Sequence, residues 1–169
     1  MDEHRASNAR DLGAIRVMDC SAGIAAAYCA KMFADAGAVS ALLTDADVVI
    51  IDADPVTGAL VGPDPQQLHA GRADLVVVAI TPYGLVGPFA GRPASELTVQ
   101  ADSGALAISG RADRPPVQAG GQITDWVTGA FAAAAALAAV RGRATSGHGA
   151  LLDVSWAEVA NMTLRPAPG

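Results

Sequence analysis

The sequence predicts an α/β protein built on a Rossmann-like parallel sheet with flanking helices. Two runs of apolar and β-branched residues, VVII at 48–51 and LVVVAITP at 75–82, are typical of strands that are covered on both faces. Segments with helical spacing or loop composition separate these runs from one another and from a further strand at 14–20. Strands that alternate with helices favour a parallel sheet with helices packed on its faces.

Length and composition are those of one globular domain. The chain has 169 residues, of which 51% are hydrophobic and 17% charged, so it can bury a core and is neither disordered nor fibrous in profile. The net charge is −6 and Lys31 is the only lysine, so nucleic acid is not an expected partner. The apolar run 126–140 is alanine-rich and shorter than the roughly 20 strongly apolar residues of a membrane span. It predicts a buried helix and no membrane partner.

The sequence predicts a cytoplasmic protein without a metal site. Its N-terminus, MDEHRASNARD, lacks the apolar segment of a secretory signal. Cys20 and Cys29 form no CxxC pair and suit two reduced thiols better than a redox or metal role. His4, His69 and His148 are far apart in the sequence and show no ligand spacing, so no metal is expected.

The first half of the chain reads as the start of an α/β unit. Residues 14–20 alternate apolar and polar side chains as a strand does, and a turn at 21–23 leads into a helix at 24–36. Gly37 is expected to end that helix. A strand at 47–52 follows, and Pro63 and Pro65 open a short helix before the strand at 75–82.

The second half begins with the glycine- and proline-rich loop YGLVGPFAGRP at 83–93. Ser95 is expected to cap a helix at 95–107. A long helix opens at Thr124 or Asp125 and runs to about Arg143, and a last strand at 150–155 leads into a helix at 156–162. The expected organisation is a disordered lead-in at 1–13, a single α/β domain at 14–162 and a tail at 163–169.

Asp125 is the residue that most needs an explanation. It lies between Ile123 and Trp126 in GGQITDWVTG (120–129), where the long alanine-rich helix begins. An aspartate at such a position often caps a helix, which contributes about 1 kcal/mol. The alternative is that it performs chemistry in a cavity beside glycine and tryptophan. The local sequence alone favours the cap.

Four stretches of the chain resemble the family III CoA-transferases, a group that includes formyl-CoA transferase, carnitine CoA-transferase and the 2-methylacyl-CoA racemases. They are RVMDCSAGIAAAYCAKMFADAGA (16–38), VVAITPYGLVGPFAGRPASELTVQADSGALAISG (77–110), PPVQAGGQITDWVTGAFAAAAALAA (115–139) and GHGALLDVSWAEVA (147–160). Their order and spacing match the N-terminal part of such enzymes, and together they cover more than half of the chain. The resemblance implies a truncated version of that fold, with an internal deletion after Ala38 and without the C-terminal half.

The resemblance implies that Asp125 is a catalytic nucleophile, because the aspartate at this position has that role in the family. It would attack the thioester carbonyl of an acyl-CoA and pass CoA to a carboxylic acid through a mixed anhydride and an aspartyl thioester. The CoA thioester is then a substrate, and no permanently bound cofactor is expected. A carboxylate is a weak nucleophile in water, so burial beside Ile123 and Trp126 would assist the attack.

The same resemblance implies binding residues around Asp125. Gly120, Gly121 and Gly129 would leave room for the acyl-CoA, and free backbone N–H groups there would steady an oxyanion. The loop at 83–93 would close over the acyl group or the pantetheine arm, unless it is an ordinary surface crossover. The expected substrate- and CoA-binding residues are Tyr83, Gly84, Gly87, Gln100, Gly120, Gly121 and Gln122, although a solvated Gln100 is equally consistent with the sequence.

One matching pair favours transfer over racemisation. Ser95 and Glu96 stand where the family's racemases carry a histidine followed by an acidic residue. Neither side chain replaces an imidazole as a proton shuttle near neutral pH. The expected partners are therefore an acyl-CoA and a carboxylic acid.

Departures from the family pattern leave a second function open. Roughly one α/β unit that helps to hold the CoA nucleotide is missing after Ala38, and the cationic candidates Arg16, Lys31, Arg72 and Arg92 do not cluster. The alternative is a non-catalytic domain that is completed by a homodimer partner or by a separate chain supplying the missing half. A dinucleotide-binding oxidoreductase has little support, because DCSAGIAA at 19–26 lacks GxGxxG.

Overall fold

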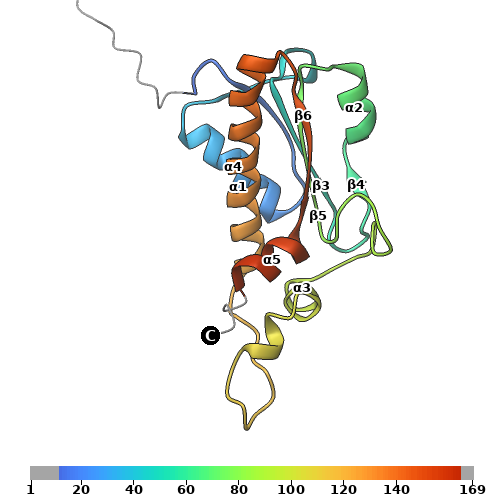
Figure 1. The fold of residues 1–169 in the computed structure, drawn as a ribbon, viewed down its shortest axis with the longest axis vertical. Coiled ribbons are helices and arrows are strands. Elements are labelled where there is room, and N and C mark those ends of the chain that lie inside the picture. The colour runs from blue at the N-terminus through green and yellow to red at the C-terminus, as the bar shows by residue number, and fades with distance from the viewer. Residues whose placement is uncertain (1–11, 165–169) are drawn as a thin grey trace, which may run out of the picture.

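A single sheet with helices on both faces forms the protein in the computed structural model, which describes residues 12–164 (Figure 1). The main path of the sheet runs β2-β1-β3-β5-β6 and is parallel throughout. Its strands are β1 (Arg16–Cys20), β2 (Val39–Ser40), β3 (Val48–Ala53), β5 (Val76–Thr81) and β6 (Ala150–Ser155). The short β4 (Leu60–Val61), which the sequence did not indicate, pairs antiparallel with the end of β3. The expected parallel α/β sheet is confirmed.

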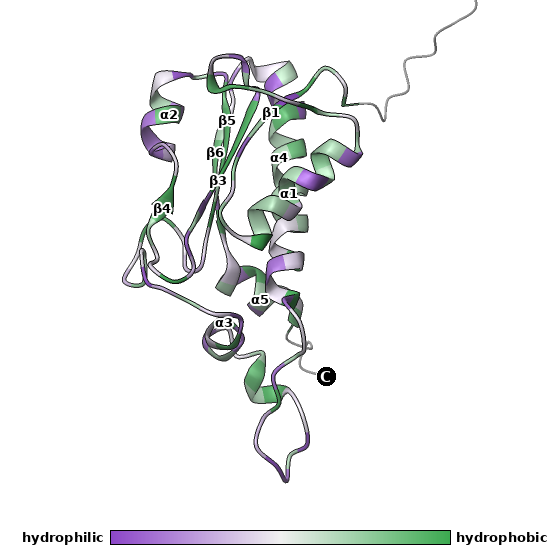
Figure 2. Cartoon of the chain, turned by 180° about the vertical axis from the view of Figure 1, so that it is seen from behind, coloured by the Kyte–Doolittle hydropathy of each residue, from purple (hydrophilic) through white to green (hydrophobic). Residues whose placement is uncertain are grey.

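Unequal layers of helix cover the two faces of this sheet (Figure 1). α1 (Ile24–Asp35), α4 (Ile123–Ser146) and α5 (Trp156–Leu164) lie over one face, and α2 (Pro65–Gly71) lies over the other. Side chains alternate along β3 and β5, so Ile50 and Val78 belong to the larger core, whereas Val49 and Val77 belong to the smaller one. Figure 2 shows these central strands as the most uniformly hydrophobic part of the fold, as expected for strands buried on both faces.

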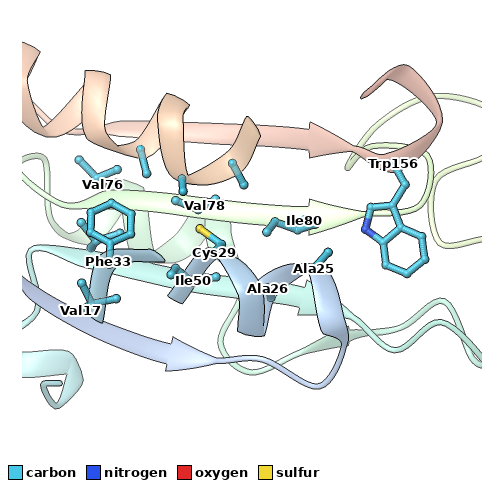
Figure 3. Close-up of a cluster of buried hydrophobic side chains, with 14 of the residues drawn as sticks. Val17, Ala25, Ala26, Cys29, Phe33, Ile50, Val76, Val78, Ile80 and Trp156 are labelled. Atoms are coloured by element: carbon cyan, nitrogen blue, oxygen red, sulfur yellow. The ribbon is translucent and has the colours of Figure 1, made fainter. Parts of the chain in front are cut away.

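In the larger core α1 and α4 lie side by side on the same face of the sheet, α1 against β1 and β3 and α4 against β5 and β6. Ala25, Ala26, Cys29 and Phe33 form the buried side of α1, and Figure 3 shows them against the side chains of β1, β3 and β5. α4 lies close to α1 because Gly129 faces it. A Cβ at Gly129 would lie 2.5 Å from the carbonyl oxygen of Ala25.

α3 (Glu96–Asp102) is shorter than the helix expected at 95–107. Ser95 caps it as predicted, because its side chain accepts the N–H of Thr98 while the Thr98 hydroxyl accepts the N–H of Ser95. The helix stops after Asp102, where Gly104 adopts a φ of 83° that side-chain-bearing residues rarely take. A separate 3-10 turn follows at Leu106–Ile108.

α4 is long and apolar enough, by composition, to cross a membrane, and it is the only such helix within residues 12–164. In this fold its buried side contains Thr124, Asp125, Thr128 and Gly129, followed by alanines and Val140. This side packs on α1 and on the sheet. α4 therefore occupies the position of a core helix.

The expected lead-in at 1–13 and tail at 163–169 lie mostly outside the described residues. Leu12 already packs against the larger core, and its N–H donates to the carbonyl of Ala36 at 3.0 Å. α5 continues to Leu164, past its expected end at 162. The connection from β2 to β3, where the sequence predicts that a unit of the family pattern is missing, holds only a 3-10 turn at Leu43–Asp45.

Candidate active site

Asp125 lies at the carboxyl ends of the parallel strands, which is where ligands usually bind in such folds. Its side chain is buried, with 5% of the residue exposed, and it faces a hollow of about 600 Å³. We call this the Asp125 hollow. Its walls come from the starts of α1, α3, α4 and α5 and from the loop after β3; the lining residues are Ala22, Gly23, Ile24, Ala27, Pro55, Val56, Ala94, Ser95, Glu96, Gln122, Asp125 and Trp156.

Asp125 does not cap α4. The residue at the N-cap position is Gln122, no side chain caps this helix end, and Asp125 follows inside the first helical turn. Its Oδ1 atom is buried and has no hydrogen-bond partner. The structure therefore excludes the explanation that Asp125 caps the helix. What it shows is a carboxylate in the wall of a cavity.

The surroundings of Asp125 disfavour its charged form. Burial, together with the nearby carboxylates of Glu96 and Asp52, raises its pKa from 3.8 to about 6, while a hydrogen bond from the Ala25 backbone amide acts in the opposite direction. A group with this pKa is ionised for the most part at neutral pH but holds its charge at a cost. Asp125 is therefore a desolvated carboxylate with a free oxygen.

Asp52, at the end of β3, closes the turn between β1 and α1. Its carboxylate accepts the N–H groups of Ala22 at 2.9 Å and Gly23 at 2.7 Å. Those amides stand at the start of α1, where a dinucleotide-binding fold presents such groups to a phosphate. Because a protein carboxylate already occupies them, the structure gives no support to a dinucleotide-binding function.

Glu96 ties α3 to the start of α4. One of its oxygens accepts the Thr124 backbone N–H at 3.0 Å, and the other accepts the Thr124 hydroxyl group. Gln100, one turn further along α3, donates to Glu96 at 2.7 Å. This chain of contacts orients the helical turn that carries Asp125.

Gln100 does not line the Asp125 hollow. It is 1% exposed, its amide oxygen accepts the N–H of Ala119 at 3.0 Å, and its amide nitrogen donates to Glu96 and to the Ala119 carbonyl. Every polar atom of this side chain therefore already has a protein partner. The geometry gives Gln100 the role of holding the loop that precedes α4.

Of the other predicted binding residues, only Gln122 lines the hollow together with Asp125. Gly120 and Gly121 are exposed and precede it in the chain, and a Cβ at either position would meet no atom within 4 Å. Both positions therefore have open space beside them, and their role in substrate binding stays a prediction. Gly129 does not: the space beside it is filled by α1, so its expected role in making room for a substrate is wrong.

The predicted residues of the loop after β5 are held by contacts outside the hollow. The hydroxyl group of Tyr83 donates to Asp102 at 2.7 Å, and its ring lies beside Phe89 and Arg92. The buried N–H of Gly84 donates to Thr81, whereas Gly87 is exposed. None of the three predicted residues, Tyr83, Gly84 or Gly87, is brought to Asp125.

The tryptophan at the hollow is not the one expected. Trp126 is 48% exposed and packs edge-on against Tyr28, whereas Trp156 is 2% exposed and lines the hollow. Sequence reasoning missed Trp156 although a signal was present. It directly follows the strand 150–155, and the residues after parallel strands gather at one edge of a sheet.

The cationic candidates and any metal-binding cluster are absent from the described lining of the hollow. Arg16, Lys31, Arg72 and Arg92 do not line it. Lys31 pairs with Asp35, and Arg72 donates to the carbonyls of Leu43 and Ala46. Across residues 12–164 no group of three or more His, Cys, Asp or Glu side chains is arranged to hold a metal ion.

Comparisons with known proteins agree with this fold and identify the family. The family described as CoA-transferase family III matches residues 38–168, and the chain belongs to that family. The succinate–glutarate CoA-transferase of Agrobacterium fabrum is 34% identical over 75% of this chain and 33% of its own length. The succinyl-CoA–D-citramalate CoA-transferase of Chloroflexus aurantiacus is 32% identical over 69% of this chain and 29% of its own length.

Solved structures show the same fold. A CAIB/BAIF family protein from Brucella suis superimposes with a TM-score of 0.75 at 19% identity, over 89% of this chain and 54% of its own. Rv3272 from Mycobacterium tuberculosis gives 0.70 at 25% identity, over 86% of this chain and 53% of its own. The chain thus spans about a third of the length of the curated relatives it matches and about half of these structures.

Proposed function

We propose that this chain carries the nucleophile of a CoA-transferase and that Asp125 moves CoA from an acyl-CoA to a carboxylic acid. The observation that supports this most is a carboxylate that is 5% exposed, has an unpartnered oxygen and lines a hollow of about 600 Å³. A role in helix capping does not explain it, because Gln122 holds the cap position.

The reaction takes place in two exchanges at Asp125. A carboxylate oxygen bonds to the acyl carbon, the carbon–sulfur bond breaks and CoA leaves as a thiolate, which yields a mixed anhydride. The thiolate then attacks the Asp125 carbonyl and releases the first acid, so that Asp125 holds CoA as a thioester. The incoming carboxylate reverses both steps: it displaces CoA to form a new anhydride, and the thiolate returns to its acyl carbon and frees the Asp125 carboxylate.

The walls of the Asp125 hollow suit this chemistry. Burial removes the water that would stabilise the carboxylate, and a pKa of about 6 makes Asp125 more basic than an exposed aspartate while leaving it ionised at neutral pH. The contacts of Glu96 with Thr124 orient the first turn of α4, so little reorganisation precedes the attack. Two matching relatives are named for succinyl-CoA or succinate, so succinyl-CoA is the first donor to test.

Trapping with hydroxylamine tests the proposal. The chain is incubated with succinyl-CoA, a carboxylic acid and hydroxylamine, and its peptides are examined by mass spectrometry. Hydroxylamine attacks anhydrides and thioesters, so we expect a hydroxamate at Asp125 and none in the Asp125→Asn variant. Exposed Asp102 serves as an internal control. Formation of the acceptor's acyl-CoA with an unmodified Asp125 contradicts the proposal.

A second candidate, a non-catalytic domain completed by another chain, is favoured by a different observation. A second hollow of about 280 Å³ lies between α1 and α4 and has an almost wholly apolar lining: Leu12, Met32, Phe33, Ala36, Ala133, Ala134 and Leu137. Apolar surface of this kind favours association. Calorimetry with CoA separates the two functions, because micromolar binding by this chain alone contradicts the non-catalytic version.

A further inference from the structure

Trp156 carries a polar atom that the fold leaves without a partner. It is the first residue of α5 and is 2% exposed, and its indole nitrogen is buried without a hydrogen bond to any described residue. A buried N–H in this state costs about 1–3 kcal/mol. Such groups in native proteins call for an explanation, and a ligand is one.

The location of this N–H distinguishes it from the other unpartnered polar atoms. Within residues 12–164 those atoms are His69 Nδ1, Asp125 Oδ1, Thr128 Oγ1 and Trp156 Nε1. Of these four residues, only Asp125 and Trp156 line the Asp125 hollow. The carboxylate oxygen of Asp125 accepts hydrogen bonds, whereas the indole N–H of Trp156 can only donate one. A ligand group that has an electrophilic carbon for the Asp125 oxygen and an acceptor oxygen next to it for the Trp156 N–H suits both atoms.

The fold holds Trp156 rigidly. The preceding Ser155 donates its hydroxyl group to the carbonyl of Pro82 at 3.3 Å, and the following Ala157 donates its N–H to the same carbonyl at 3.1 Å. The start of α5 is thus fixed to the loop that follows β5. Figure 3 shows the indole beyond the end of that strand, with its nitrogen on the edge turned towards Ile80 and Ala25. Ala25 is also the residue whose backbone amide contacts the Asp125 carboxylate.

We propose that the indole N–H of Trp156 donates a hydrogen bond to the acyl carbonyl oxygen of the thioester that Asp125 attacks. This inference rests on the proposed function. As the Asp125 oxygen bonds to the acyl carbon, the carbonyl electron pair moves onto the acyl oxygen, and the N–H stabilises the charge that develops there. When the carbon–sulfur bond breaks, that pair re-forms the carbonyl and the thiolate leaves. A fixed donor in a water-poor site stabilises such an oxyanion more strongly than water does.

Indole resonances in a ¹⁵N-labelled protein test the contact directly. Trp126 and Trp156 are the only tryptophans, so two indole N–H signals are expected, and Trp156→Phe assigns them. The probe is acetyl-CoA, added to the Asp125→Asn variant so that the thioester stays intact. We expect the Trp156 indole proton to move downfield, as a newly bonded donor does, while the signal of exposed Trp126 stays in place.

A kinetic measurement completes the test. Trp156→Phe keeps an aromatic ring and removes the donor, and its expected effect is a fall in the rate of Asp125 acylation by about 100-fold, with the half-saturating acetyl-CoA concentration little changed. Trp126→Phe is the matched control and should acylate at the wild-type rate. A Trp156 signal that does not respond to acetyl-CoA, or a Trp156→Phe variant that acylates as fast as the wild type, overturns the inference.

The two proposals fail in distinguishable ways. If Asp125 is acylated but the Trp156 signal does not respond, Trp156 is rejected as the hydrogen-bond donor and Asp125 is retained as the nucleophile. If the Trp156 signal responds to acetyl-CoA but neither acetyl-CoA nor succinyl-CoA acylates wild-type Asp125, the hydrogen-bond donor is retained and the proposed transfer is rejected.

Discussion

Asp125 is expected to lower the stability of the protein in a pH-dependent way. Its pKa is raised from 3.8 to about 6 by burial and by neighbouring carboxylates, so the folded state holds the proton more tightly than the unfolded state. The free energy of unfolding therefore falls as the pH rises from about 4 to 6, by up to about 3 kcal/mol, and stays lower above that range.

Asp125→Asn removes this effect. We expect urea denaturation to show a variant about 1–3 kcal/mol more stable than the wild type near pH 8 and close to it near pH 4. Asp45→Asn, at an exposed position, is the control and should change neither value. An equal stabilisation at both pH values would show that packing, not ionisation, is responsible.

Glu96 offers a second test at the scale of a residue. Its charge is one of the causes that raise the pKa of Asp125. Glu96→Gln retains the shape and a hydrogen-bonding oxygen towards Thr124 but removes the charge, so the pKa of Asp125 should fall. The acid limb of the pH profile for Asp125 acylation then moves to lower pH, and an unchanged midpoint would exclude this electrostatic coupling.

Sequence reasoning reached the central residue but not its neighbours. Asp125 and Gln122 lie in one stretch before a long helix, and a family resemblance marks that stretch. The position of Trp156 depends on how β6 lines up with β5, and the occupied amide of Gln100 depends on the path of the loop at Ala119. The contacts of Gln100 are tertiary and no local pattern contains them, whereas the place of Trp156 directly after a predicted strand was a usable signal.

The packing of α1 on α4 predicts a large effect at one glycine. A Cβ at Gly129 would lie 2.5 Å from the Ala25 carbonyl oxygen and 3.0 Å from the Tyr28 Cβ, both on α1. Gly129→Ala should therefore cost about 1–3 kcal/mol through overpacking, although alanine favours helices.

A matched glycine in the same helix supplies the control. Gly142 is exposed, and a Cβ there would meet nothing within 4 Å, so Gly142→Ala should stabilise the protein by up to about 1 kcal/mol. Both variants are compared by urea denaturation. Stabilisation by Gly129→Ala would contradict the close approach of the two helices.

Elements were predictable where a strong local signal exists. The runs of β-branched residues predicted the strands β3 and β5, and the capping residue Ser95 predicted where α3 begins. The two-residue strands β2 and β4 carry no such signal, because each is a strand only through its pairing with β1 or β3. The end of α3 depends on the turn at Gly104, which a helical pattern through 107 conceals.

At the scale of the whole molecule, the parallel sheet explains why the site lies where it does. The starts of α1, α3, α4 and α5 reach the Asp125 hollow from segments far apart in the chain. The alternation of strands and helices predicted this architecture from the sequence. It could not predict the apolar hollow between α1 and α4, which depends on how closely the two helices approach.

That second hollow predicts association of the chain with a second copy. Sedimentation velocity should show concentration-dependent dimers, and Leu137→Glu, which places a charge in the apolar lining, should shift them to monomers. Ala138→Glu, at the next and exposed position of α4, is the control. A wild-type chain that is monomeric at every concentration contradicts this surface as a homodimer interface.

Transfer of an oxygen atom from the acceptor acid to Asp125 is a direct sign that this side chain acts as the nucleophile. The acceptor acid is labelled with heavy oxygen in its carboxylate and turned over with succinyl-CoA. In the proposed route the acceptor oxygen bridges to Asp125 in the second anhydride and remains on the aspartate when the new acyl-CoA departs. We therefore predict heavy oxygen on Asp125 in the peptide mass spectrum. Formation of the new acyl-CoA with unlabelled Asp125 would rule out Asp125 as the nucleophile.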